Sequence, residues 1–213
     1  MKLPRKPRAV VFDLDGTLID SEALVKEAHF AACDHMGVTM TDAQFLSLVG
    51  LHREANDLQL KGYYGDDFPL EHFIGLTRAH VGDRVAPLKA GAAELMNELD
   101  ALALPFGLAT SSRRPWVEKH FTAYALAPRF RVVVTRQDVT EGKPHPEPYL
   151  QASRLLGAAP EDVLALEDSY AGVTAAHAAG CMTVMVPDLL TATDEMRARA
   201  LIVASLNDVR ALL

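Results

Sequence analysis

The 213-residue chain contains only two cysteines, Cys33 and Cys181, and neither lies in a metal-ligand spacing. We therefore expect two reduced, buried thiols rather than metal ligands. The sequence also lacks long apolar runs, and the first run, Ala9–Phe12, is interrupted at once by Asp13. No stretch is long enough for a signal peptide's apolar region or for a membrane span, so we expect a cytoplasmic protein.

Positive charge is in short supply as well. The chain has 21 Lys and Arg against 28 Asp and Glu, a formal net charge of −7. This balance argues against binding to duplex nucleic acid, which requires clustered basic residues. An anionic substrate would have to bind through a local site and a metal ion. Hydrophobic residues make up 49% of the chain, so we expect a packed core in one large domain or in a core plus a smaller insert.

Short apolar runs rich in β-branched residues recur along the chain. Each reads as a strand buried on both faces, and together they are Ala9–Phe12, Phe106–Ala109, Val132–Thr135, Val163–Leu166, Thr183–Val186 and Leu201–Ala204. The amphipathic stretches between them are predicted helices at Ala92–Leu102, Trp116–Tyr124, Pro148–Leu156 and Ala171–Ala179. This alternation predicts an α/β fold with a parallel sheet wrapped by helices.

One region interrupts the alternation. Between Ile19 and Arg84 the pattern contains no convincing strand, and it predicts helices at Glu22–Met36, Asp42–Val49, Glu54–Leu60 and Leu70–Val81. Thr41 offers an N-cap for the second of these helices. The glycine-rich stretch after Lys61 reads as a loop. We therefore predict a helical insert at residues 19–84 and a discontinuous core formed by residues 1–18 and 85–213.

Two acids follow the first predicted strand. Asp13 and Asp15 lie two residues apart, so on an extended strand their side chains point the same way. Their mutual repulsion calls for a cation or a shared proton, and Mg²⁺ suits oxygen ligands of this kind. Gly16 permits a tight turn directly after them. The alternative is a strand end that carries ordinary turn acids.

Other predicted strands also end in polar side chains. Thr110 and Ser111 follow the second strand and can hold phosphate oxygens, or can simply cap the next helix. Lys143 lies in a proline-rich loop that can fix its charge against a phosphate, or can leave it in solvent on a rigid connector. Glu167 and Asp168 end the fourth strand, where they can complete a metal site or cap the following helix.

These segments resemble the motifs of one known family, in the same order. The stretches VFDLDGTLIDSE, LATSS, GKPHPEPY and LALEDSYAGVTAA lie between Arg8 and Pro187. They resemble those of the haloacid dehalogenase superfamily of hydrolases, in the branch with a helical cap after the first strand. The resemblance implies a Rossmann-like parallel sheet core with an inserted α-helical cap. It also implies a Mg²⁺-dependent phosphatase for a small phosphorylated metabolite.

The resemblance assigns a role to each motif residue. It makes Asp13 the nucleophile, Asp15 the general acid and base, and Thr110 the phosphate-binding hydroxyl. Lys143 matches the lysine that steadies the nucleophile and the phosphate, and its bond to Pro144 is expected to be cis. The implied Mg²⁺ ligands are Asp13, the backbone carbonyl of Asp15, Asp168, and Glu167 either directly or through water.

The insert resembles the cap segment of β-phosphoglucomutases and sugar-phosphate phosphatases at Leu48–Glu54. In the mutases the counterpart of Arg53 grips a second phosphate, but Val49 stands where those enzymes usually have lysine. Arg53 can instead form salt bridges on a helix face, and Glu22 can either meet a sugar hydroxyl or cap its helix. The predicted substrate-binding residues are Glu22, Gly50, His52, Arg53 and Ser111.

The resulting hypothesis is a phosphatase that acts on a phosphorylated sugar or similar metabolite through an aspartyl-phosphate. The nearest alternative is a mutase that returns the phosphate to the sugar. A true haloacid dehalogenase is disfavoured, because those enzymes lack an acid at the position of Asp15. An inactive ligand-binding protein is the alternative from another class. We expect a monomer or weak homodimer, and we assign Trp116 only a packing role.

Overall fold

The computed structural model of the chain describes residues 2–51 and 53–213. Its described part contains a six-stranded sheet in the order β3-β2-β1-β4-β5-β6, and every strand pair is parallel. The strands are β1 (Ala9–Phe12), β2 (Phe106–Ala109), β3 (Val132–Val134), β4 (Val163–Glu167), β5 (Met182–Met185) and β6 (Leu201–Ile202). The predicted α/β class is confirmed.

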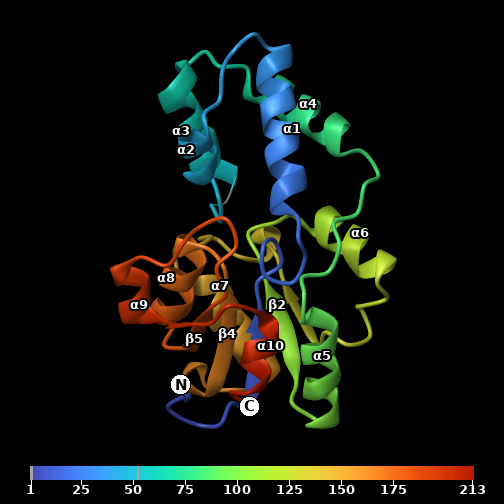
Figure 1. Ribbon diagram of the computed structural model, residues 1–213, viewed down its shortest axis with the longest axis vertical. Helices are drawn as coiled ribbons and strands as arrows, with labels where there is room; N and C mark the ends of the chain where they lie inside the picture. The colour runs from blue at the N-terminus through green and yellow to red at the C-terminus, as the bar shows by residue number, and fades with distance from the viewer. Residues whose placement is uncertain (1, 52) are drawn as a thin grey trace.

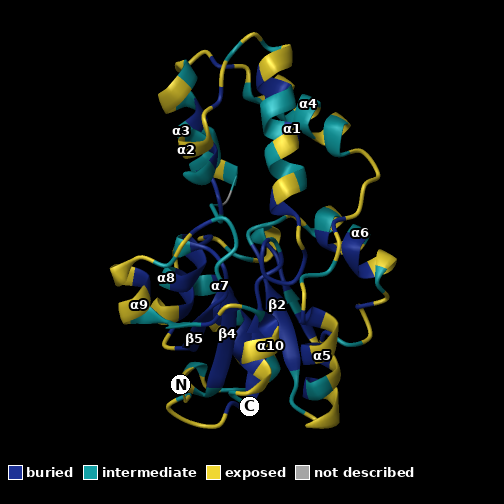
Figure 2. Ribbon diagram, viewed as in Figure 1, coloured by how far each residue is buried: buried dark blue, intermediate teal, exposed yellow. Residues whose placement is uncertain are grey.

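Helices cover both faces of this sheet, as Figure 1 shows. Alternate residues of β1 divide between two apolar clusters, with Val10 and Phe12 in one and Ala9 and Val11 in the other. Figure 2 shows the strands β1, β2, β4 and β5 as buried, while much of α5 and α9 is exposed. The covering helices are α5 (Ala92–Ala101), α6 (Arg114–Ala123), α7 (Glu147–Leu156), α8 (Tyr170–Ala178), α9 (Asp194–Arg199) and α10 (Leu206–Arg210).

The strand order places the first strand at the centre of the sheet. β1 pairs with β2 on one side and with β4 on the other, so the chain changes direction across the sheet at β1. In an open parallel sheet, ligands bind beyond the carboxyl ends of the strands at such a reversal. Asp13, Thr110 and Asp168 follow β1, β2 and β4, and their side chains therefore gather at one edge.

Among the residues that the structure describes, four further helices lie beyond the carboxyl ends of the strands (Figure 1). They are α1 (Glu22–His35), α2 (Asp42–Leu46), α3 (Arg53–Tyr64) and α4 (Leu70–Val81). They share an apolar cluster that is separate from the two clusters of the sheet and includes Cys33, Phe45 and Phe73. Thr41 caps α2 in a capping box with Gln44, as its sequence predicts.

Two chain segments join these helices to the sheet, and they run side by side. Asp20 N donates to Pro87 O at 2.7 Å, and Lys89 N donates to Leu18 O at 3.0 Å. The predicted boundaries at 18/19 and 84/85 lie beside this pair. Both chain crossings are therefore tied to each other close to the site edge of the sheet.

The structure also corrects details of the sequence analysis. The stretch after Lys61 is not a loop at its start, because α3 continues to Tyr64, whose ring packs 4.8 Å from that of Phe68. Helices α9 and α10 follow β5 and were not predicted. Cys33 and Cys181 are free and buried, as expected. Among the described residues, no helix has both the length and the apolar character needed to cross a membrane.

Candidate active site

The centre of the site is a buried ion-pair cluster beyond β1 and β4. Asp13, the first residue after β1, is 6% exposed, and Lys143 is 1% exposed. The Lys143 ammonium donates to Asp13 Oδ1 and to Glu167 Oε1, each at 2.5 Å. Lys143 reaches this position from the loop before α7, and its bond to Pro144 is cis, as predicted. Lys143 occupies one oxygen of Asp13, and no described residue donates to the other, Oδ2.

The charges in this cluster shift one another's protonation. Burial opposes the charge on Lys143, but the carboxylates of Asp13 and Glu167 outweigh burial and raise its pKa above the ordinary value. Burial also raises the pKa of Asp13 to about 8, with Glu167 and Asp15 adding to the rise and Lys143 opposing it. Lys143 therefore remains an ammonium, whereas the acids around it resist being ionised together without a further cation.

This lack of positive charge, together with the donor set, fits a divalent cation. One carboxylate oxygen from each of Asp13, Glu167 and Asp168 lies within 4.8 Å of the others, and all three residues are buried. Burial, with the nearby charges of Asp13 and Glu167, raises the pKa of Asp168 well above its ordinary value. Carboxylate oxygens are the ligands that Mg²⁺ prefers, and a cation among them would favour their ionised forms.

Asp168 approaches the backbone of the first loop closely. A Cβ on Gly16 would lie 2.2 Å from Asp168 Oδ2, and Gly16 has a φ of +78°. Both the space and the backbone conformation therefore require glycine here. The Thr17 hydroxyl donates to Asp168 Oδ1 at 3.2 Å, while no described residue donates to Oδ2. Asp168 can thus present an oxygen to a cation held with Asp13.

Glu167 is surrounded by hydrogen-bond donors. Besides Lys143, its Oε1 accepts from the Tyr149 hydroxyl at 2.6 Å, and its Oε2 accepts from the Ser169 hydroxyl at 3.1 Å. A Cβ on Gly172 would lie only 1.9 Å from this carboxylate, so the first turn of α8 makes room for it. These contacts suit Glu167 to hold Lys143 in place, and its predicted role as a metal ligand stays a prediction.

Asp15 is held by donors from three different segments. Its Oδ1 accepts from the Ser21 hydroxyl at 2.7 Å and from the Trp116 indole N–H at 2.8 Å, and its Oδ2 accepts from the Ser112 hydroxyl at 2.6 Å. Sequence reasoning missed Ser21, Ser112 and Trp116. The two serines stand inside the recognised motifs, whereas Trp116 lies one helical turn beyond them and carries no local signal.

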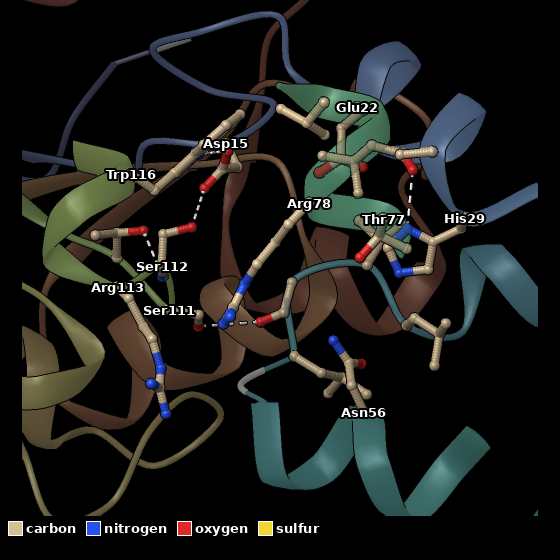
Figure 3. A pocket seen from close by; sticks show the side chains of 18 of the residues that line it. Asp15, Glu22, His29, Asn56, Thr77, Arg78, Ser111, Ser112, Arg113 and Trp116 are labelled. Carbon is tan, nitrogen blue, oxygen red and sulfur yellow. Dashed lines mark hydrogen bonds between the residues drawn. The ribbon is translucent and has the colours of Figure 1, made fainter. Parts of the chain in front are cut away.

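A cavity of about 700 Å³ opens between the sheet edge and the helices α1 to α4. Asp13, Asp15 and Thr110 line it from the sheet side. Ser111 and Gly50 meet across it, because the Ser111 hydroxyl donates to Gly50 O at 3.3 Å. Figure 3 shows the side chains that project into this cavity from both sides.

Some lining residues of the cavity were not predicted from the sequence. Asn56 on α3 and Arg78 on α4 both line it (Figure 3). The Asn56 Oδ1 atom is buried and has no hydrogen-bond partner among the described groups. The Arg78 guanidinium has no hydrogen bond or ion pair with any of the described residues. Their sequence contexts gave no signal, because each lies on a helix whose facing partners are set only by the fold.

Only some of the predicted substrate-binding residues of the helical insert line the cavity. Glu22 and Gly50 line the cavity, but Arg53 is not among the described residues that do so. The Arg53 guanidinium instead pairs with Asp57 at 3.0 Å and with Glu71 at 2.5 Å. Its role in substrate binding, like that of Ser111, stays a prediction. His52 lies outside the described residues.

Glu22 is a buried carboxyl that forms no ion pair with any of the described residues. It is 7% exposed, begins α1 and is the last residue of the first motif. Burial raises the pKa of Glu22 to about 8, and the charges of Asp15, Asp188 and Asp13 add to the rise. At neutral pH this side chain is therefore largely a neutral carboxyl, able both to donate and to accept a hydrogen bond in the cavity.

The chain is similar to known proteins over most of its length. Residues 10–186 match the family described as haloacid dehalogenase-like hydrolases. YhcW of Bacillus subtilis is 33% identical over 189 residues, which span 87% of this chain and 86% of that protein. The phosphoglycolate phosphatase of Escherichia coli is 32% identical over 201 residues, 83% of this chain and 80% of that enzyme. The structure of CbbY from Rhodobacter sphaeroides in complex with phosphate superposes with a TM-score of 0.80 at 23% identity, covering 95% of this chain and 96% of that one.

Proposed function

Because the chain belongs to the family of haloacid dehalogenase-like hydrolases, we propose that it hydrolyses the phosphate ester of a small sugar-like metabolite through an aspartyl-phosphate on Asp13. The observation that carries this proposal is the setting of Asp13. It is buried at the end of the central strand, Lys143 holds one of its oxygens, and the other oxygen has no donor from the described residues. An inactive binding protein would not need this paired carboxylate next to a cavity.

In the first half of the reaction, Asp13 Oδ2 attacks the phosphorus atom. A new oxygen–phosphorus bond forms as the ester oxygen–phosphorus bond breaks, and the departing alkoxide takes a proton from Asp15. Lys143 keeps Asp13 oriented and offsets the negative charge of the incoming phosphate. The Thr110 hydroxyl, 2% exposed at the end of β2, lies where it can bind a phosphate oxygen.

In the second half, water attacks the phosphorus atom and Asp15 accepts its proton. The bond to Asp13 breaks, inorganic phosphate leaves, and the Asp13 carboxylate is restored. Asp13, Asp168 and the backbone carbonyl of Asp15 would hold Mg²⁺, with Glu167 directly or through water. A bound Mg²⁺ would neutralise phosphate charge and favour the ionised form of Asp13.

The cavity supports a substrate larger than a bare two-carbon phosphate. Its volume of about 700 Å³ is in the range of small-molecule sites. Glu22 and Asn56 offer hydrogen-bonding groups without partners among the described residues, which suits the hydroxyls of a sugar. Arg78 adds a cation for a polar or anionic group at the far end. We propose that residues 19–84 act as a cap that closes over such a substrate.

The test is phosphate release with Mg²⁺ across a panel of sugar phosphates, phosphoglycolate and nucleotides. We expect the highest kcat/KM for a sugar phosphate, and we expect Asp13→Asn to remain folded with less than a tenth of wild-type activity. The amide is nearly isosteric but cannot form the phosphoenzyme. Retention of activity by this variant would refute the covalent mechanism, and release from no ester would favour a binding protein.

A second assay separates hydrolysis from the mutase alternative. Val49 is 8% exposed and lines the cavity, so it offers no ammonium for a second phosphate. Such a charge-assisted contact is typically worth about 1.5–3 kcal/mol. With β-glucose 1-phosphate and a trace of the 1,6-bisphosphate, we therefore expect inorganic phosphate to form faster than glucose 6-phosphate. Rapid formation of glucose 6-phosphate with little free phosphate would assign a mutase instead.

A further inference from the structure

Trp116 makes a directional contact with the proton-transfer group of the proposed mechanism. Its indole N–H donates to Asp15 Oδ1 at 2.8 Å. The other two donors to Asp15 among the described residues are the hydroxyls of Ser21 and Ser112, whose hydrogens can rotate toward other acceptors. The indole has a single donor in one fixed direction. Among the donors to Asp15, Trp116 is therefore the one that defines where Oδ1 must lie.

The Trp116 ring is itself held in place by its own helix. The His120 ring lies edge-on to it, with 4.3 Å between the centroids, and His120 is fully buried. His120 Nε2 accepts from the backbone N–H of Ala86 at 3.1 Å, so its Nδ1 carries the proton and donates to Trp116 O at 2.9 Å. The Lys119 ammonium lies 5.3 Å from the Trp116 ring centroid.

The side chains of Lys119 and His120 also bind the segment that leads from the helical insert back to the sheet. Lys119 Nζ donates to the carbonyl of Gly82, the C-cap of α4, at 2.8 Å, and His120 accepts from Ala86. On the other side of the insert, Ser21 precedes α1 and donates to Asp15. Asp15 is thus linked to the first chain crossing through Ser21 and to the second through Trp116 and α6.

We propose that Trp116 is a positioning residue for Asp15, and this inference rests on the function proposed above. By fixing Oδ1, the indole directs the Asp15 carboxyl toward the ester oxygen that must be protonated as it leaves. A tryptophan that served only to pack would bring its ring and no N–H contact to a catalytic carboxylate. Trp116 acts through Asp15 and takes no part in bond making.

The test exploits the leaving group. Departure of p-nitrophenolate needs little protonation, whereas a sugar alkoxide needs a well-placed acid. For Trp116→Phe, which keeps the ring and loses the N–H, we expect kcat/KM to fall about tenfold or more on the best sugar phosphate and less than about twofold on p-nitrophenyl phosphate. The control is Tyr124→Phe at the C-cap of α6, which removes the 3.0 Å hydrogen bond from the Tyr124 hydroxyl to Ala86 O without reaching Asp15. It should leave the ratio of the two values unchanged.

Equal losses on both esters, or no loss on either, would overturn the proposal. A second readout does not depend on turnover, because Trp116 is the only tryptophan of the chain. Asp15→Ala should shift the Trp116 emission maximum, while Asp57→Ala on α3 should not, and an unshifted spectrum in Asp15→Ala would show that the contact is absent. If the wild-type protein hydrolysed neither ester, the proposed function would fall, and the emission spectra would still decide on the contact.

Discussion

Two arginines of the helical insert differ in what their guanidinium groups contact. Arg53 is paired with Asp57 and Glu71, whereas Arg78 lines the cavity and has no ion pair among the described residues. We therefore expect Arg78→Ala to raise KM for the best sugar phosphate about fivefold or more while kcat changes less than about twofold, as for binding shared by ground and transition states. Steady-state kinetics measure both constants.

Arg53→Ala is the matched comparison for this prediction. It removes a partly buried ion pair with Asp57 and an exposed one with Glu71, each worth about 1 kcal/mol, so we expect a slightly lower melting temperature and an unchanged KM. A raised KM in Arg53→Ala with no effect of Arg78→Ala would restore the role that the family resemblance implies for Arg53. The comparison therefore decides which cation meets the far end of the substrate.

Glu22 gives a prediction about stability and pH. Its pKa is raised from 4.5 to about 8 by burial, so between these values the native state holds a proton that the unfolded state has released. The native state is thereby destabilised as pH rises through this window. Glu22→Gln lacks this ionisation, so we expect it to match the wild type near pH 4 and to be more stable by on the order of 3 kcal/mol above pH 8.

The measurement is urea unfolding in chelator at a series of pH values. Glu94→Gln is the control, because Glu94 also stands in the first turn of a helix, α5, but is exposed. It should show no gain that depends on pH. If the difference in unfolding free energy between Glu22→Gln and the wild type did not change with pH, the pKa of Glu22 would not be raised. The carboxyl would then be ionised at neutral pH.

Some residues of the site could be predicted from the sequence, and others could be found only in the folded structure. Asp13 and Lys143 could be predicted because each stands at a strand end or in a stiff loop, where local pattern fixes its place. Trp116, Asn56 and Arg78 could not, because their contacts arise when separate helices meet around the cavity. Arg53 lies in a segment that the sequence analysis did single out. Its ion pairs with Asp57 and Glu71 became visible only in the folded structure.

At the scale of elements, the helical insert touches the sheet edge at Gly50. A Cβ at this position would lie 2.4 Å from the Cβ and Oγ of Ser169, and the backbone there has a φ of +77°. Gly50→Ala would push the insert away from Ser169, the N-cap of α8. We expect kcat/KM to fall about tenfold or more, since small displacements of substrate-positioning elements are costly.

Gly37→Ala separates strain from displacement. Gly37 also has a positive φ, +68°, but a Cβ there would meet nothing within 4 Å. Both variants should lose about 1–2 kcal/mol of stability to the left-handed backbone, measured by chemical denaturation, and only Gly50→Ala should lose activity. A comparable loss of activity in Gly37→Ala would mean that general destabilisation, and not the contact with Ser169, limits turnover.

Helix and strand positions were predictable to within a few residues where one rule governs the segment. Buried strands such as β1 are short apolar runs whatever their neighbours, and α4 was predicted at its observed bounds, Leu70–Val81. The rule failed after Lys61, where glycine and tyrosine favour a loop locally. There the contacts of Tyr64 with Phe68 and Thr39 stabilise the last turn of α3, which the low helix propensity of glycine and tyrosine does not favour.

At the scale of the whole molecule, this haloacid dehalogenase-like phosphatase concentrates acidic side chains where its sheet changes direction. Asp13, Glu167 and Asp168 share one buried edge with a single ammonium, Lys143. Desolvated carboxylates that repel one another destabilise the native state unless a cation joins them. We therefore expect a lower free energy of unfolding for the metal-free protein than for the protein with a divalent ion bound.

Thermal unfolding with and without Mg²⁺ tests this expectation. Saturating Mg²⁺ should raise the wild-type melting temperature by about 5 °C or more, because it binds only the folded site. Burial raises the pKa of Asp168 well above its ordinary value, so the ionised form opposes folding as pH rises toward neutrality. Asp168→Asn removes that charge and an oxygen ligand together. It should melt at or above the wild-type temperature in chelator and gain almost nothing from Mg²⁺.

The control for that experiment is Asp42→Asn, which removes an exposed acid in the first turn of α2 and leaves the buried edge intact. It should keep the full response to Mg²⁺. A large Mg²⁺ response in Asp168→Asn would place the ion elsewhere. A clear drop in its melting temperature in chelator would show that the Asp168 carboxylate stabilises the fold by itself, through contacts such as that with Thr17, and would contradict the account of a charged edge that a cation must complete.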